Sequence, residues 1–198
     1  MIRKGRMMSK NENCQTNGCN SNDCSSNRCN FSSVRPAIME LPYPPMQVSE
    51  KNQVYANLLS VDYCGSVSEL SAITQYINSE SRLSHEHCAL AQTILGIAMA
   101  EMMHLQKLGE LICLLGGTVD YAARQPNGRL RLWTPEYLTL PQQPAQMIAV
   151  NIEAEQAAIA QYRMHMKMIR DTCVNAVLAR IIKDEEYHIM MLRALMEG

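Results

Sequence analysis

Two short motifs in the sequence have the residue types and the spacing of a metal-binding site. Each is a Glu-x-x-His set, Glu101 to His104 and Glu185 to His188, inside a long segment with helical patterning. On an α-helix, residues i and i+3 lie on one face about one turn apart, so one carboxylate and one imidazole can bind the same ion. A single motif of this kind occurs easily by chance. Its recurrence in one chain makes it informative.

A further glutamate precedes each motif, at the start of an octet that is itself repeated. Glu69 begins ELSAITQY and Glu155 begins EQAAIAQY, and the two octets align without a gap. They lie 32 positions before Glu101 and 30 positions before Glu185. Polar residues that suit a turn lie midway, near positions 85 and 170. The chain therefore repeats one helical hairpin, with Glu on one arm and Glu-x-x-His on the other.

This pattern resembles the ferritin-like di-iron carboxylate proteins, bacterioferritin and rubrerythrin in particular. That family uses one Glu from each of two helices and Glu-x-x-His from each of the other two. The resemblance covers about residues 50–197. It implies an all-α fold, an antiparallel four-helix bundle with one long crossover between its second and third helices. The metal ligands that it implies are Glu69, Glu101, His104, Glu155, Glu185 and His188.

Four helices are predicted from the patterning and the end signals. Ser49 is a suitable N-cap for the first, Gly116-Gly117 ends the second, and Pro144 suits the first turn of the third. The predicted helices are residues 50 to about 82, the following residues to 115, 144 to about 169, and 172 or 173 to almost 198. The long connection from 117 to 143 lets the third helix run beside the second in the same direction.

Two divalent cations would balance the negative charge of the four predicted glutamate ligands. Four carboxylates in an apolar interior repel one another and take up protons, whereas two cations neutralise them. The resemblance implies that Glu101 and Glu185 bridge the ions, that Glu69 and Glu155 bind terminally, and that each histidine binds one ion. This oxygen-rich set suits two iron ions, with two manganese ions as the alternative. The competing interpretation, inward salt bridges, would be costly to bury.

Further residues are candidates for supporting roles. By the resemblance, Asp184 orients His104 from the opposite helix. Ala100 stands at the equivalent position of the other motif, so His188 lacks that partner and the two metal positions become inequivalent. Tyr76 and Tyr162 each follow their octet glutamate by seven residues, and they either hydrogen-bond ligands, relay electrons or fill the core.

Met102 stands where bacterioferritin has its haem-ligating methionine. The chain contains 15 methionines, so a single match is weak, and we interpret Met102 as core filling. Haem is not expected.

The first 48 residues differ from the rest, which we predict to be the bundle (49–198). Asn, Ser and Cys dominate residues 8–33, a Pro-rich lead-in follows, and Cys14, Cys19, Cys24 and Cys29 recur at an interval of five. This tail is either disordered or a metal-binding or cross-linking segment. It lacks the Cys-x-x-Cys pairs of the rubredoxin domain in rubrerythrins. Buried free thiols in a reducing compartment are expected at Cys64, Cys88, Cys113 and Cys173.

These features predict a dinuclear metal oxidoreductase of the ferroxidase or peroxidase type, in oxidative-stress defence or iron handling. Its partners would be peroxide or dioxygen and an external electron donor. Alternatives are dimanganese peroxide dismutation and a non-enzymatic metal-binding protein of a larger assembly such as a spore coat.

The predicted setting of the protein follows from charge, hydropathy and length. A net charge of −1 gives no case for nucleic acid or an anionic membrane as partner. No apolar run of bilayer length and no secretory signal is expected, which favours the cytoplasm. Only ten residues follow His188, too few for the fifth helix of bacterioferritin, so a homodimer or small homo-oligomer is expected rather than a cage.

Overall fold

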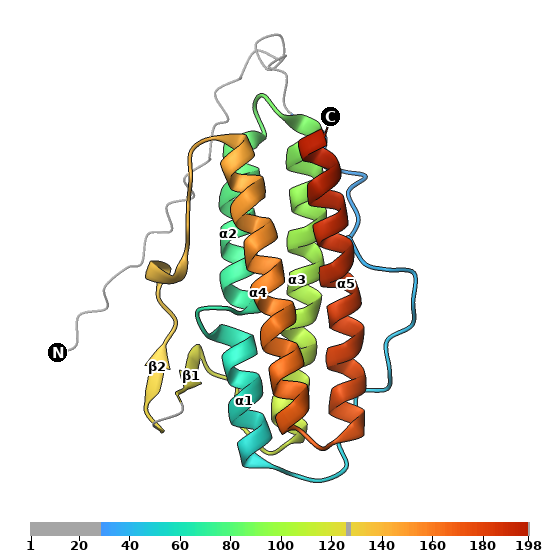
Figure 1. Cartoon of the computed structure of the whole chain (residues 1–198), viewed down its shortest axis with the longest axis vertical. Helices are drawn as coiled ribbons and strands as arrows, with labels where there is room; N and C mark the ends of the chain where they lie inside the picture. The colour runs from blue at the N-terminus through green and yellow to red at the C-terminus, as the bar shows by residue number, and fades with distance from the viewer. Residues whose placement is uncertain (1–28, 126–127, 198) are drawn as a thin grey trace, which may run out of the picture.

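The computed structural model describes residues 29–125 and 128–197. Within these ranges the helices form four roughly parallel rods (Figure 1). The elements are α1 (Gln53–Cys64), α2 (Glu69–Leu83), α3 (Cys88–Leu114), β1 (Ala122–Arg124), β2 (Leu130–Leu132), the 3-10 helix η1 (Pro135–Tyr137), α4 (Pro144–Met168) and α5 (Thr172–Glu197). α1 and α2 follow one another along the first rod. The predicted all-α four-helix bundle is confirmed.

One long connection joins the two helical hairpins. Short turns link α2 to α3 and α4 to α5, whereas the connection from α3 to α4 travels from one end of the bundle to the other (Figure 1). It carries the antiparallel hairpin of β1 and β2, in which Ala123 lies opposite Arg131. As predicted, α4 therefore runs in the same direction as α3.

The first rod is broken, so the prediction of one continuous helix from residue 50 to about 82 is wrong. Asn52, not Ser49, caps α1, and its side chain accepts hydrogen bonds from two backbone N–H groups. A Cβ at Gly65 would lie 2.6 Å from the carbonyl oxygen of Val61, so the chain leaves the helix at a glycine. Ser68 then caps α2. The break makes Glu69 the first residue of α2.

Apolar layers fill the bundle on both sides of a polar layer. Leu108 of α3 and Leu178 of α5 belong to one core cluster, and Ile94 of α3 and Leu192 of α5 belong to another. The Glu-x-x-His motifs lie between these positions on both helices. The fold therefore buries the six predicted ligands at mid-height.

Residues 34–48, here called the strap, lie against α3 and α5 (Figure 1). The Ala37 N–H donates to the Gly96 carbonyl at 2.8 Å, and the Arg180 guanidinium donates to the carbonyls of Met39 and Leu41. A Cβ at Gly96 would lie 3.0 Å from the Arg35 carbonyl oxygen. Glycine thus permits close packing of the strap. Because residues 1–28 lie outside the described ranges, the division of the chain at residue 48 stays a prediction.

The cysteines differ from the prediction of four buried free thiols. Cys64 is buried, but Cys173 is half-buried and Cys113 is exposed on the outer face of α3. Cys88, the first residue of α3, forms a disulfide with Cys29 and is therefore not a free thiol. The other three tail cysteines, Cys14, Cys19 and Cys24, lie outside the described residues.

One of the described helices, α3, is long and apolar enough to cross a membrane by length and composition. The expectation that no apolar run reaches that length is wrong for this helix. The core helix of a bundle meets the same criterion. Since α3 buries Glu101 and His104 in the polar layer, we interpret it as a core helix.

Candidate metal centre

Four rods each contribute to one buried cluster of acids and histidines. Every one of the six residues is at most 3 % exposed. They are Glu69 of α2, Glu101 and His104 of α3, Glu155 of α4, and Glu185 and His188 of α5. The helical hairpins predicted from the sequence therefore bring together all six residues.

Two of the glutamates lie between the two histidines. Glu101 places Oε2 3.0 Å from Nδ1 of His104 and Oε1 3.0 Å from Nδ1 of His188. Glu185 places Oε1 3.3 Å from Nδ1 of His104 and Oε2 3.1 Å from Nδ1 of His188. Each carboxylate thus presents one oxygen to each imidazole. This is the disposition that bridging carboxylates between two ions require.

The other two glutamates each lie on one side. Glu69 approaches Nδ1 of His104 at 3.7 Å, and Glu155 approaches Nδ1 of His188 at 3.5 Å. The ligand atoms form two sets, each within 4.8 Å, and both sets include Glu101 and Glu185. Two overlapping sets of four donors suit a pair of ions.

The donor atoms fit divalent cations. Oε1 of Glu101 and Oε1 of Glu185 are buried without a hydrogen-bond donor, an expensive condition for carboxylate oxygens. Among the described residues, no Lys or Arg forms an ion pair with any of the four glutamates. Two divalent ions would supply the missing positive charge.

Without ions, the pKa values of the cluster diverge. Burial, and then the charge of neighbouring carboxylates, raises the pKa of Glu69 and of Glu155 well above the ordinary value. Burial acts in the same direction on Glu101, but hydrogen bonds and the two imidazoles lower its pKa. Burial alone would lower the pKa of both histidines, but the surrounding carboxylates raise it. Protons therefore take the place of cations in the metal-free cluster.

Two tyrosines cross the bundle to the terminal glutamates. Tyr76 of α2 donates its hydroxyl hydrogen bond to Oε1 of Glu155 on α4, and Tyr162 of α4 donates to Oε1 of Glu69 on α2. Burial, followed by the adjacent carboxylate charge, raises the pKa of both phenols. Both remain neutral donors. Of the roles considered from the sequence, this geometry matches hydrogen bonding to ligands.

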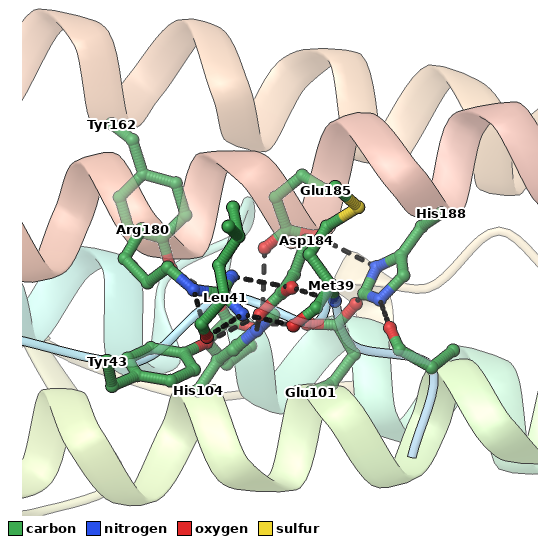
Figure 2. A network of polar contacts seen from close by, with 12 residues as sticks. Met39, Leu41, Tyr43, Glu101, His104, Tyr162, Arg180, Asp184, Glu185 and His188 are labelled. Carbon is green, nitrogen blue, oxygen red and sulfur yellow. Dashed lines mark hydrogen bonds and ion pairs between the residues drawn. The ribbon is translucent and has the colours of Figure 1, made fainter. Parts of the chain in front are cut away.

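A carboxylate holds the outer nitrogen of His104. Oδ2 of Asp184 lies 3.1 Å from His104 Nε2 and accepts the Tyr43 hydroxyl at 2.6 Å, while Oδ1 accepts the Met39 N–H at 2.7 Å (Figure 2). Burial alone would raise the pKa of Asp184, but the hydrogen bonds from His104, Tyr43 and Arg180 hold it below its usual range. Asp184 is therefore ionised, and its Oδ2 can accept a hydrogen bond from the Nε2–H group of His104.

A backbone carbonyl holds the outer nitrogen of His188. Nε2 of His188 lies 2.8 Å from the carbonyl oxygen of Ala37 in the strap. Because a carbonyl only accepts, Nε2 carries a proton, and in the neutral ring Nδ1 would be left free to bind an ion. The sequence indicated only that Ala100 offers His188 no carboxylate. It did not reveal Ala37, because a backbone atom 151 residues away leaves no side-chain signal.

Comparison with known protein families identifies the family of this chain. The family model described as the ferritin-like domain matches residues 67–198, about two thirds of the chain. The chain belongs to the ferritin-like family.

Several relatives are similar to this ferritin-like chain. A probable manganese catalase of Clostridium acetobutylicum is 26 % identical over 165 residues, which cover 75 % of this chain and 72 % of the relative. The crystal structure of KatB, a manganese catalase from Anabaena PCC7120, aligns with a TM-score of 0.68 and 22 % identity, covering 80 % of this chain and 78 % of KatB.

Bacterioferritin BfrA of Mycobacterium tuberculosis also has this fold. It aligns with a TM-score of 0.61 and 23 % identity, covering 75 % of this chain and 87 % of BfrA. The resemblance noted from the sequence is confirmed at the level of the ferritin-like di-metal carboxylate proteins.

A cavity of about 260 Å³ leads to the cluster of this ferritin-like bundle. It lies between α2 and α4, and the break in the first rod and the α3–α4 connection contribute Ser68 and Tyr137 to its wall. All four glutamates of the cluster line it. A small molecule could therefore reach the carboxylates from this side.

The remaining histidines and Met102 lie outside the ligand set. Met102 is 45 % exposed, so its interpretation as core filling is wrong; it follows Glu101 on the outer face of α3. His85 and His87 are exposed, as expected for the turn before α3. His165 is buried and contacts Asp62.

Proposed function

We propose that this ferritin-like protein is a dinuclear metal oxidoreductase that reacts with peroxide. The observation that carries the proposal is the position of Glu101 and Glu185, each with one oxygen toward each histidine. Both are buried, and in the described part of the chain no Lys or Arg pairs with either of them. The proposed ligands are the six residues of the cluster, with Asp184, Tyr76 and Tyr162 in supporting roles.

Two ions of variable oxidation state would exchange electrons with the oxidant. The protein's own groups set the conditions for that exchange. Glu101 and Glu185 would hold the ions together, and the outer hydrogen bonds of the histidines would keep each Nδ1 directed inward. Tyr76 and Tyr162 would fix one oxygen of each terminal carboxylate. The apolar layers on both sides would limit access to the cavity.

Dismutation of hydrogen peroxide by two manganese ions is the form that we favour. Support comes from the 26 % identity to a probable manganese catalase, spread over three quarters of this chain. A di-iron ferroxidase or peroxidase with an external electron donor is the second candidate. Support for it comes from the four glutamates and two histidines, since iron and manganese both accept this oxygen-rich set.

The test combines metal analysis with oxygen evolution. The full chain is purified, its metals are measured, and peroxide is added without a reductant to protein loaded with manganese or with iron. Oxygen release from the manganese form supports dismutation. Peroxide consumption only with ferrous ion or a reductant supports the di-iron alternative. Two bound ions with neither activity would contradict an enzyme and favour a metal-loaded structural protein.

A homodimer or small homo-oligomer remains part of the proposal. Exposed apolar side chains on the outer helix faces, including Ile77, Met102 and Met190, offer surface for such contacts. Size-exclusion chromatography with light scattering distinguishes a small oligomer from a cage of many subunits.

A further inference from the structure

A second buried acid–histidine pair lies outside the six ligands. Asp62 of α1 is 1 % exposed and His165 of α4 is 3 % exposed, and Nδ1 of His165 lies 2.7 Å from Oδ2 of Asp62. Gln161 donates to Oδ1 of Asp62 at 2.8 Å and to the Val67 carbonyl at 2.8 Å. In the described structure, the side-chain hydrogen bonds of Asp62 and His165 join them to one another and Asp62 to Gln161, not to a predicted ligand.

One member of this pair, Asp62, reaches the cavity that leads to the cluster. Asp62 lines the same cavity as Glu69, Tyr162 and Glu185. Its position follows from the break in the first rod, because α1 ends two residues after Asp62 and the cavity opens beside residues 66–68. Asp62 thus shares one cavity with the four glutamates of the cluster, and His165 contacts Asp62 without lining that cavity itself.

Peroxide chemistry needs a group that takes up and returns protons. Reduction of hydrogen peroxide to two waters consumes two electrons and two protons. Oxidation of a second peroxide to dioxygen releases two electrons and two protons. The two half-reactions balance, but they occur at different times, so protons must be held near the site between them. In a buried site, bulk water cannot perform this task alone.

We propose that Asp62 and His165 form a proton relay that accepts protons from the cavity and returns them during peroxide reduction. This inference rests on the proposed function. His165 holds the proton toward Asp62, and Asp62 exchanges it with the cavity. Gln161 positions the carboxylate by donating to its other oxygen.

The electrostatics agree with that geometry. Burial raises the pKa of Asp62, whereas His165 and then Gln161 oppose the rise. The carboxylate is therefore easier to protonate than an exposed aspartate. The other titratable groups that line this cavity come from five elements: Glu69 of α2, Glu101 of α3, Tyr137 of η1, Glu153, Glu155 and Tyr162 of α4, and Glu185 of α5.

A purely structural role is the competing explanation. The Asp62–His165 contact joins α1 to α4 beside the break, and Gln161 does the same through two hydrogen bonds. Both roles predict some loss of thermal stability on substitution. Only the relay predicts that proton movement changes while metal binding persists.

The test uses metal-loaded full-length protein with His165→Gln and Asp62→Asn. His85→Gln, which removes an exposed histidine, is the matched control. Metal content and melting temperature are measured first. Proton uptake on binding of azide, an anion probe, is then measured by calorimetry in buffers of different ionisation enthalpy. Peroxide turnover is followed across pH, with and without added imidazole.

The relay predicts that both variants retain two ions but take up fewer protons with azide than the wild type. It also predicts turnover about 10²-fold lower, a changed pH profile and partial rescue by imidazole. Wild-type proton uptake and an unchanged pH profile in both variants would overturn the relay while leaving the proposed function intact. Absence of peroxide turnover in the wild type would instead overturn the proposed function, and the relay with it.

Discussion

His104 and His188 face the candidate ions in the same manner, but different groups hold their outer nitrogens. Inside, each Nδ1 lies 3.0–3.3 Å from one oxygen of Glu101 and one of Glu185. Outside, Asp184 accepts from His104, whereas a strap carbonyl accepts from His188. A carboxylate makes an imidazole a stronger ligand than a carbonyl does. The repeated hairpin therefore determines the inner half of the centre, which is the six ligands, and not the outer half, which is the groups that accept from the histidine Nε2 atoms.

The largest loss of metal binding is expected from substitutions of the six ligands, to which the two helical hairpins should contribute equally. Glu101→Ala and Glu185→Ala each remove a carboxylate shared by both donor sets, so both variants should lose two-ion loading to a similar degree. Mass spectrometry of bound metal measures this, and circular dichroism shows whether each variant folds. Two ions at wild-type affinity in either variant would contradict the ligand assignment.

Removal of the ions tests the inner half as a whole. Without metal, the pKa is raised for four groups: Glu69, Glu155, His104 and His188. Their stabilising contribution is complete below the unfolded pKa and is lost as pH rises toward the folded pKa. Glu101 and Glu185, with lowered pKa values, act in the opposite sense.

Since the raised groups outnumber the lowered ones, the melting temperature of metal-free protein should fall between about pH 5 and pH 8. Metal-loaded protein should not show this fall, because ions replace the protons. Melting curves with and without a chelator measure the difference. A parallel pH dependence in both forms would show that the ions do not occupy the cluster.

Substitutions in the outer half should affect the two ions unequally. Asp184→Asn keeps the shape but removes the charge beside His104, so affinity should fall about 10–100-fold for one ion and remain for the other. Chelator competition resolves the two ions. Glu186→Gln, which changes an exposed carboxylate on the same helix, is the control. Equal weakening of both ions would mean that the outer partners do not distinguish the positions.

The two tyrosines should behave alike, because their contacts are related by the repeat. Tyr76→Phe and Tyr162→Phe each remove one buried hydrogen bond to a terminal glutamate. Each should lower the free energy of unfolding by about 1.5 kcal/mol. Urea denaturation of both variants measures this value. A much larger loss of unfolding free energy in one of the two variants would show that the two hairpins also differ around the glutamate ligands.

The smallest effect is expected at the strap. Gly96→Ala places a methyl group 3.0 Å from the Arg35 carbonyl and should displace the strap slightly, weakening the ion beside His188 by less than about tenfold. Gly109→Ala, also in α3, adds its methyl group at an ordinary 3.4 Å from Tyr63 and controls for helix propensity. Similar metal affinities in the two variants would show that the strap does not affect binding of the ion beside His188.

The same contrast explains what the sequence could predict. Glu69, Glu155 and the two Glu-x-x-His sets were visible because helical spacing fixes which side chains share a face. The four rods and the crossover followed from that repeat and from the end signals at Gly116-Gly117 and Pro144. Family membership agrees with this prediction.

Contacts between distant segments were not visible. The Ala37 carbonyl, the Tyr43 hydroxyl and the Asp62–His165 pair depend on tertiary packing across 103 to 151 residues. The break at residues 65–68 was missed because the apolar pattern continues on both sides of it. Gly65 followed by serines was the available signal.

The most direct test is a crystal structure of the metal-loaded protein with anomalous scattering measured at the manganese and iron edges. We predict two adjacent peaks, both in contact with Glu101 and Glu185, one beside His104 and the other beside His188. A single peak, or ions bound away from these side chains, would contradict a dinuclear centre.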